Sequence, residues 1–252
     1  MNLFFRKTGK GAPLIILHGL FGSSDNWLSI AKILEEHHTV FTIDQRNHGQ
    51  SPHSNDFSYE HMADDLKKII IEQHIESPII LGHSMGGKTA MKFAVNNPAM
   101  LKKLIVVDIG PKEYPVHHDI ILKGLNSINI AALKSRVEAD QLLSKYISDI
   151  GIRQFLLKNI ARSSNGFQWK INLPIITSKI KQVGVGLLSD DRYEGDSLFI
   201  RGGNSNYILD EDVDMLNQHF PNHKLETVDN AGHWVHAEQP NLFVEKVINF
   251  IK

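Results

Sequence analysis

The sequence predicts an α/β fold in which helices cover both faces of a mainly parallel sheet and a helical cap is inserted between two strands. Short apolar runs alternate with segments whose apolar residues recur at three-and-four spacing, which is the pattern of strand–helix–strand units. The apolar runs are continuous, as is typical of strands buried on both faces. The alternation breaks between residues 112 and 188, where the cap is expected.

Six apolar runs, each flanked by Gly, Asp or Asn, are predicted to form buried strands. They are Pro13–Leu17, Thr39–Ile43, Pro78–Leu81, Leu104–Val107, Leu198–Ile200 and Leu225–Val228. The segment Asn2–Lys7 is predicted to add an edge strand. Helices are predicted over Trp27–Glu36, Tyr59–His74, Ser84–Asn96, Val213–Phe220 and Asn241–Ile251.

Residues 112–188 are predicted to form the cap, and residues 1–111 and 189–252 the core. Three helices are expected in the cap, followed by a stretch with Trp, Ile and Pro that shows no clear strand. They cover Ile120–Leu125, Ala131–Ser144 and Ile150–Ile160. The cap holds 11 Lys and Arg against 5 Asp and Glu, a net charge of +6, which leaves −7 for the rest of the chain.

Composition excludes several classes of protein. With 42% hydrophobic and 22% charged residues, the chain matches ordinary soluble globular proteins. The absence of cysteine excludes disulfides, thiolate metal sites and a cysteine nucleophile. A net charge of −1 gives no indication of nucleic-acid binding. Met1–Gly11 lacks the apolar core of a signal peptide and no stretch is long enough to span a membrane, so we expect a cytoplasmic protein without membrane insertion.

The sequence Gly-His-Ser-Met-Gly at residues 82–86 carries the strongest functional signal. It follows an apolar strand and begins a helix, which is the context of a strained turn that exposes a nucleophilic serine. The turn packs so tightly that side chains at Gly82 and Gly86 would clash. Ser84 also lies at a helix N-terminus, where the helix dipole favours negative charge. We therefore predict Ser84 as a catalytic nucleophile.

The base is expected late in the chain, in the order serine, acid, histidine. His233 lies directly after the last predicted strand and before the closing helix, on the same edge of the sheet as Ser84. We predict His233 as the base, whereas His236 is nearer the helix and is expected to be structural.

An oxyanion hole of two backbone amides is expected next to the serine. The amide of Met85, directly after the nucleophile, supplies one donor. The loop at residues 18–22 follows an earlier strand and supplies the other. Leu20 is the first choice on this loop and Phe21 the second.

The catalytic acid is harder to assign from the sequence than the serine and the histidine. After the strand at Leu198–Ile200, where such an acid is common, no carboxylate occurs before Asp210. Asp108 ends the preceding strand and lies at the same edge of the sheet, and Asp210 lies where a helix N-cap is expected. We favour Asp108 and retain Asp210 as the alternative. Ser205 could hydrogen-bond the imidazole or the carboxylate.

The polar loop at residues 44–51 follows another strand. Its glycine and polar side chains are typical of a network that orders a loop. We expect structural roles for Arg46 and His48, because neither has a place in the predicted chemistry.

The motifs together resemble the α/β-hydrolase superfamily, and more narrowly the bacterial YbfF-type esterases and their relatives in the abhydrolase group. The matching stretches are residues 18–27, 44–51, 82–88, 106–111, 201–205 and 231–240. They extend over the whole chain. The resemblance implies an α/β-hydrolase fold, Asp108 as the acid and Ser205 as a fourth member of the network. It is weakest in the cap, so it says least about substrate specificity.

The resemblance implies a carboxylesterase that needs no cofactor or metal and acts on a small-molecule acyl ester. Acyl-CoA and other acyl thioesters are the alternative substrates. Carbon–carbon bond hydrolases and perhydrolases share the same catalytic residues and are further alternatives. A protein of this fold that binds a ligand without turnover is the alternative from another class.

Overall fold

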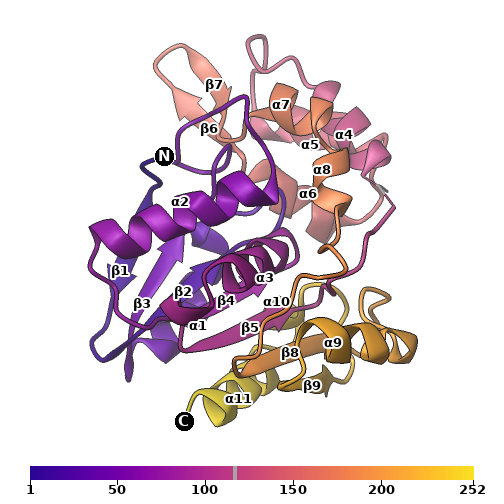
Figure 1. Cartoon of the computed structure of the whole chain (residues 1–252). Coiled ribbons are helices and arrows are strands. Elements are labelled where there is room, and N and C mark those ends of the chain that lie inside the picture. Colours follow the sequence, from indigo (N-terminus) through magenta and orange to yellow (C-terminus); the bar gives the residue numbers. More distant parts are fainter. Residues whose placement is uncertain (116–117) are drawn as a thin grey trace.

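A seven-stranded sheet lies at the centre of the computed structural model, which describes residues 1–115 and 118–252 (Figure 1). The strands are β1 (Phe5–Thr8), β2 (Ala12–Leu17), β3 (His38–Ile43), β4 (Ile79–His83), β5 (Lys103–Val107), β8 (Ser197–Gly202) and β9 (His223–Val228). They lie in the order β1-β3-β2-β4-β5-β8-β9. β1 is antiparallel to β3, and the other neighbours are parallel. The predicted mainly parallel sheet is confirmed.

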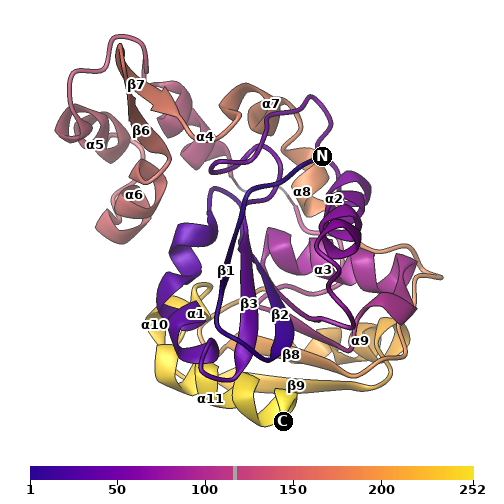
Figure 2. The same ribbon diagram turned by 90° about the vertical axis from the view of Figure 1, so that its left-hand side faces the viewer.

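Helices cover both faces of this sheet (Figure 2). The core helices are α1 (Leu28–Leu34), α2 (Tyr59–Glu72), α3 (Met85–Asn96), α9 (Val213–His219), α10 (Val235–Glu238) and α11 (Pro240–Ile251), with short 3₁₀ turns η1 (Ser24–Trp27), η2 (Pro98–Met100) and η3 (Asp210–Asp212). The ends of the five predicted core helices lie within two residues of their predicted positions. Within the described residues, no helix is long and apolar enough to cross a membrane.

Neighbouring residues of a strand pack on opposite faces, which explains the continuous apolar runs. In β2, Leu14 and Ile16 pack in one core with residues of α1 and α11. Ile15 and Leu17 pack in another core with residues of α2, α3 and α9. All four side chains are almost completely buried, because each face of the sheet has its own layer of helices.

The insertion between β5 and β8 is mainly helical. It contains α4 (Asp119–Asn126), α5 (Arg136–Ser144), α6 (Ile150–Leu157), β6 (Ile160–Ser163), β7 (Gly166–Trp169), α7 (Leu173–Ser178) and α8 (Lys181–Gly184). Residues 116–117, which fall inside the predicted cap, lie outside the described residues.

Three predictions within the insertion are wrong in detail. The helix expected over Ile150–Ile160 ends at Leu157, and Ile160 begins β6. The stretch around Trp169, in which no strand was expected, forms the β6–β7 hairpin; its strands are too short to show clear alternation, and Gly166 turns the chain with φ +125°. The helix expected from Ala131 begins only at Arg136, because the Ser135 side chain accepts a hydrogen bond from the Glu138 amide and caps the helix there.

The insertion packs on the carboxyl edge of the sheet. A third apolar core joins Leu122 and Leu156 of the insertion to Leu20, Phe21 and Met85 of the α/β core. Figure 2 shows the insertion, with α4 to α8, at one end of the sheet whose strands β1, β2 and β3 are labelled below it. The loops that follow the strands therefore lie between the sheet and the insertion.

Two linkers join the insertion to the sheet, a first one at residues 111–112 and a second one at residues 185–187, and they run side by side. The Leu187 amide of the second linker donates to the Pro111 carbonyl of the first at 2.8 Å. The Lys88 ammonium, on α3, donates to the carbonyls of Lys112 in the first linker and Val185 in the second, the latter at 3.0 Å. One buried side chain thus joins both linkers to the core.

Candidate active site

The turn between β4 and α3 holds Ser84 in a strained conformation, with φ 52° and ψ −118°. Non-glycine residues rarely adopt positive φ and keep it only where the surrounding structure requires it. A Cβ atom on Gly82 would lie 2.2 Å from the carbonyl oxygen of Gly86, and one on Gly86 would lie 2.4 Å from that of Leu17. Only glycine fits at these two positions, as the sequence analysis predicted for a nucleophile turn.

Asp108 follows β5 and is completely buried. Its Oδ2 lies 2.8 Å from Nδ1 of His233. A carboxylate can only accept, so Nδ1 carries the proton and Nε2 keeps a lone pair. The side chain of Asp210 is 90% exposed and pairs with Arg201 at 2.7 Å. Of the two candidate acids, the structure brings Asp108 to the histidine and leaves Asp210 with a different partner.

Two further donors hold the Asp108 carboxylate. The Gly202 amide donates to Oδ1 at 3.0 Å, and the Ser205 hydroxyl donates to Oδ2. Both come from the end of β8 and the loop after it. The structure therefore places Ser205 on the predicted acid, which was one of its two expected partners.

The loop that carries His233 is held by two side chains that the sequence analysis missed. The Tyr207 ring stacks on the imidazole of His233 with a centroid distance of 4.2 Å and an interplanar angle of 24°. Nε2 of His83 donates to the His233 carbonyl at 2.8 Å. Burial lowers the pKa of His83 well below its usual value, and the nearby His233 and His236 lower it further. The place of His83 beside Ser84 was a usable signal, whereas Tyr207 had none.

His236 has the structural surroundings that the sequence predicted. Its ring stacks on Trp27 with a centroid distance of 4.0 Å and an interplanar angle of 11°. Burial lowers the pKa of His236 to about 3, with a smaller contribution from His233. The neutral imidazole therefore packs as part of the apolar core.

The loop at residues 18–22, here named the oxyanion loop, lies beside the nucleophile turn. A Cβ atom on Gly19 would lie 3.3 Å from Cβ of Ser84. The Phe21 amide donates to Nε2 of His48 at 3.2 Å and is therefore already engaged. The amides of Leu20 and Met85 remain as candidate oxyanion donors from the predicted set.

The loop at residues 44–51 packs behind the oxyanion loop. Arg46 is buried; its Nε lies 2.8 Å from Oδ2 of Asp65, and its Nη1 donates to the Asp56 carbonyl at 2.9 Å. These contacts agree with the expected ordering role of Arg46. His48 has a contact beyond its own loop that was not expected, because it accepts a hydrogen bond from the Phe21 amide of the oxyanion loop.

Comparisons with known proteins show the family to which the chain belongs. A family model described as the alpha/beta hydrolase fold matches residues 12–127. The chain is 37% identical over 246 residues to the mouse (Mus musculus) protein named sn-1-specific diacylglycerol lipase ABHD11, covering 94% of this chain and 80% of that protein. It is 33% identical over 243 residues to esterase YbfF of Escherichia coli (strain K12), covering 96% and 94%. The chain belongs to the α/β-hydrolase fold family.

A solved structure of a marine microorganism esterase matches this α/β-hydrolase with a TM-score of 0.97 and 47% sequence identity, over 99% of both chains. The resemblance stated from the motifs is confirmed, and the names of these relatives support the predicted ester hydrolysis.

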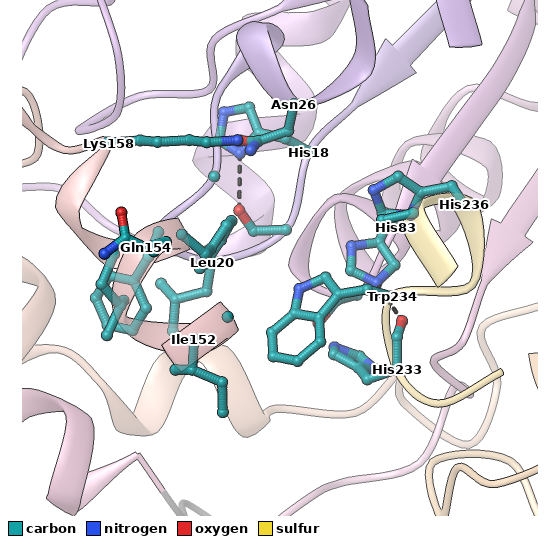
Figure 3. A pocket seen from close by; sticks show the side chains of 18 of the residues that line it. His18, Leu20, Asn26, His83, Ile152, Gln154, Lys158, His233, Trp234 and His236 are labelled. Atoms are coloured by element: carbon teal, nitrogen blue, oxygen red, sulfur yellow. Dashed lines mark hydrogen bonds between the residues drawn. The ribbon is translucent and has the colours of Figure 1, made fainter. Parts of the chain in front are cut away.

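Ser84, His233, Leu20 and Phe21 of this α/β-hydrolase line one cavity of about 790 Å³, within the usual range for small-molecule sites. Ser84, His233 and the oxyanion loop form one part of its wall, and α6 of the insertion forms another. Figure 3 shows Ile152 and Gln154 of α6 on one side and His233 and Trp234 on the other. A substrate in this cavity would contact the core and the insertion together.

Within the described residues, no group of three or more His, Asp or Glu side chains is arranged to hold a metal ion. The expectation that this α/β-hydrolase needs no cofactor stays a prediction. The geometry itself offers a half-buried serine hydroxyl on the cavity wall, a histidine with a free lone pair and a buried carboxylate, which are the groups that nucleophilic catalysis uses.

Proposed function

We propose that this chain is a carboxylic ester hydrolase that forms an acyl-enzyme on Ser84. The observation that carries the proposal is the joint placement of three groups. Ser84 lies on a strained turn and lines the same cavity as His233, and Nδ1 of His233 lies 2.8 Å from the buried Asp108 carboxylate. The relatives named esterase and lipase support ester hydrolysis as the reaction.

In the first half-reaction, the Oγ atom of Ser84 attacks the acyl carbonyl carbon and His233 Nε2 accepts the hydroxyl proton. The Leu20 and Met85 amides donate to the oxygen on which negative charge develops. The buried Asp108 carboxylate stabilises the imidazolium. The bond to the alcohol then breaks, and the alcohol leaves with the proton from His233.

In the second half-reaction, water attacks the acyl carbon and His233 again takes the proton. The Ser84 ester bond breaks, the carboxylic acid is released, and the hydroxyl of Ser84 regains its proton. All steps use side chains and amides of this chain, and the substrate is a small-molecule ester. The cytoplasmic location expected from the sequence remains a prediction.

Replacing Ser84 by alanine tests the nucleophile directly. Ser84→Ala is expected to abolish hydrolysis of p-nitrophenyl esters and covalent labelling by a fluorophosphonate. Because alanine is small, the turn should keep its structure, which circular dichroism and thermal unfolding can check. Labelling that persists on the folded variant would show that the nucleophile is a different residue.

Acyl thioesters are the second candidate substrates, since the same residues can attack a thioester. One observation favours them: the insertion carries a net charge of +6, and its Lys158 lines the cavity. A panel of p-nitrophenyl esters and acyl-CoAs with matched acyl chains would rank the two classes by kcat/KM. No turnover of any substrate on the panel, together with no fluorophosphonate labelling, would favour a ligand-binding protein without turnover.

A further inference from the structure

Phe21 lies on the oxyanion loop in an unusual backbone conformation. It has φ 60°, which an aromatic residue keeps only where neighbouring contacts fix it. It follows Leu20, whose amide is the proposed oxyanion donor. The contacts that fix Phe21 therefore also decide how rigidly the Leu20 amide is held.

The first of these contacts comes from His48, which is completely buried. Its Nδ1 lies 2.9 Å from the Arg46 carbonyl, and its Nε2 lies 3.2 Å from the Phe21 nitrogen. A carbonyl accepts and an amide donates, so Nδ1 carries the proton and Nε2 is the acceptor. Burial lowers the pKa of His48 to about 3, with a smaller effect of His18, so the neutral acceptor persists near neutral pH.

The hydrogen bond from the Phe21 amide to His48 holds the backbone directly next to the Leu20 amide, the proposed oxyanion donor. The Phe21 N–H and the Leu20 carbonyl belong to one planar peptide group. Fixing that plane restricts the rotation of the chain at Leu20, whose own N–H lies on the preceding peptide. His48 is thus placed to hold the direction of the oxyanion donor without touching substrate.

The second contact comes from the insertion. Nδ2 of Asn159 donates to the Phe21 carbonyl at 2.8 Å and to the Leu156 carbonyl at 3.1 Å. Asn159 is buried and lies two residues after the end of α6, the helix that lines the cavity. The peptide group on each side of Phe21 is therefore held by a separate side chain, one from the core and one from the insertion.

We propose that His48 and Asn159 are positioning residues that hold the oxyanion loop through the backbone of Phe21. The oxyanion hole is then complete only while the insertion is packed against the α/β core. The proposal rests on the proposed function. It assigns His48 a role that its sequence motif did not suggest, and it links the insertion to catalysis as well as to substrate shape.

The variants His48→Gln and His48→Leu test the core contact. Both lose the Nδ1 donor to Arg46, but glutamine keeps a side-chain acceptor at a distance from the backbone close to that of Nε2. Removal of a whole oxyanion donor typically lowers kcat by about 10²–10³-fold. Displacement of the donor should cost less, so His48→Leu is expected to lower kcat by about 10–10²-fold with KM nearly unchanged. His48→Gln is expected to recover most of that loss.

The variants Asn159→Ala and Asn126→Ala test the contact from the insertion. Asn126 is the matched control, because it also lies at the end of a helix of the insertion and its Nδ2 donates to a backbone carbonyl, that of Leu122. Asn159→Ala is expected to lower kcat about 10-fold with little change in KM, and Asn126→Ala is expected to change neither.

A pair of inhibitors separates a positioning role from general loss of structure. A trifluoromethyl ketone forms an oxyanion on the serine, and the matching methyl ketone does so far less readily. Loss of positioning should weaken inhibition by the trifluoromethyl ketone several-fold more than inhibition by the methyl ketone. Equal weakening of both, or kcat within twofold of the wild type in both His48→Leu and Asn159→Ala, would overturn the proposal.

Two other outcomes have a defined meaning. If His48→Leu does not fold, the comparison of Asn159→Ala with Asn126→Ala decides on its own. If the wild type neither hydrolyses esters nor reacts with fluorophosphonate, the proposed function fails first, and the inference built on it fails with it.

Discussion

Asp108 receives hydrogen bonds from three parts of the chain. The His233 ring, the Gly202 amide and the Ser205 hydroxyl all donate to its carboxylate. Such charge-assisted bonds are stronger than neutral ones and fix the orientation of both oxygen atoms. The histidine therefore meets a carboxylate that is already in position, which limits the rearrangement needed when the imidazolium forms.

Asp108→Asn is expected to lower kcat by about 10⁴-fold, the size of the loss when the acid of a well-studied serine triad is replaced by asparagine. The amide keeps the shape of the side chain but cannot stabilise the imidazolium. Asp210→Asn, at an exposed position paired with Arg201, is the matched control and is expected to have little effect. Steady-state kinetics on one p-nitrophenyl ester decide between them, and the reverse ranking would move the acid to Asp210.

The kcat of Ser205→Ala is expected to lie between the kcat values of Asp108→Asn and Asp210→Asn. The hydroxyl orients the Asp108 carboxylate but carries no charge, so its loss weakens the position of the acid without removing it. Burst kinetics with a p-nitrophenyl ester would measure the acylation rate directly. An acylation rate equal to that of the wild type would limit Ser205 to a structural role.

Ser84 and His233 could be proposed from the sequence because each lies in a short local pattern. Ser84 lies between two glycines that only a tight turn explains, and His233 follows the last strand. His48 and Asn159 could not be assigned in the same way. Their shared partner, Phe21, lies 27 and 138 residues away along the chain, and local periodicity does not encode such contacts.

At the scale of elements, the predicted core helices and strands agree with the structure because burial on two faces gives long, regular patterns. The insertion was less predictable. Its hairpin has strands of four residues, and the start of α5 depends on one capping serine. Short elements whose stability comes from tertiary packing leave little periodic signal in the sequence.

The linkers of the insertion meet at an unusual lysine. The pKa of Lys88 is lowered to about 7, mainly by burial; the nearby Glu113 opposes this shift, and Lys112 adds a smaller lowering effect. In an unfolded chain a lysine has a pKa of about 10.4. Between these values the unfolded state binds more protons than the folded state, so the contribution of Lys88 to stability rises as the pH increases.

Lys88→Met removes this titration. The free energy of unfolding of the wild type minus that of the variant is therefore expected to increase from pH 7 to pH 10, with a slope of at most about 1.4 kcal/mol per pH unit. Urea unfolding followed by circular dichroism at pH 7, 8 and 9 would measure it. A difference that stays constant across this range would mean that the ammonium is equally solvated in both states.

At the scale of the whole molecule, charge is divided between the insertion, at +6, and the rest of the chain, at −7. Lys158 lies at the end of α6 and lines the cavity. A positive rim would attract anionic substrates such as acyl-CoA, and the attraction weakens as salt shortens the Debye length from about 30 Å at 0.01 M to about 8 Å at 0.15 M.

Across that range of salt, kcat/KM for an acyl-CoA is expected to fall while that for a neutral ester of the same acid stays nearly constant. Lys158→Gln should reduce the salt dependence more than Lys145→Gln, a lysine of the insertion that does not line the cavity. Parallel salt curves for the two substrates would leave the charges of the insertion without a role in substrate capture.

The position of the insertion also has a consequence for synthesis on the ribosome. β5 and β8 pair in the finished sheet, but β8 leaves the ribosome about 90 residues later, roughly 5 to 20 seconds at ordinary rates of translation. Until then β5 is an edge strand with an apolar run from Leu104 to Val107, which is a site for aggregation. His233 is synthesised later still, after β9. A nascent chain of this protein therefore passes through an inactive stage that needs protection, and slow codons or stalling within the insertion would lengthen it.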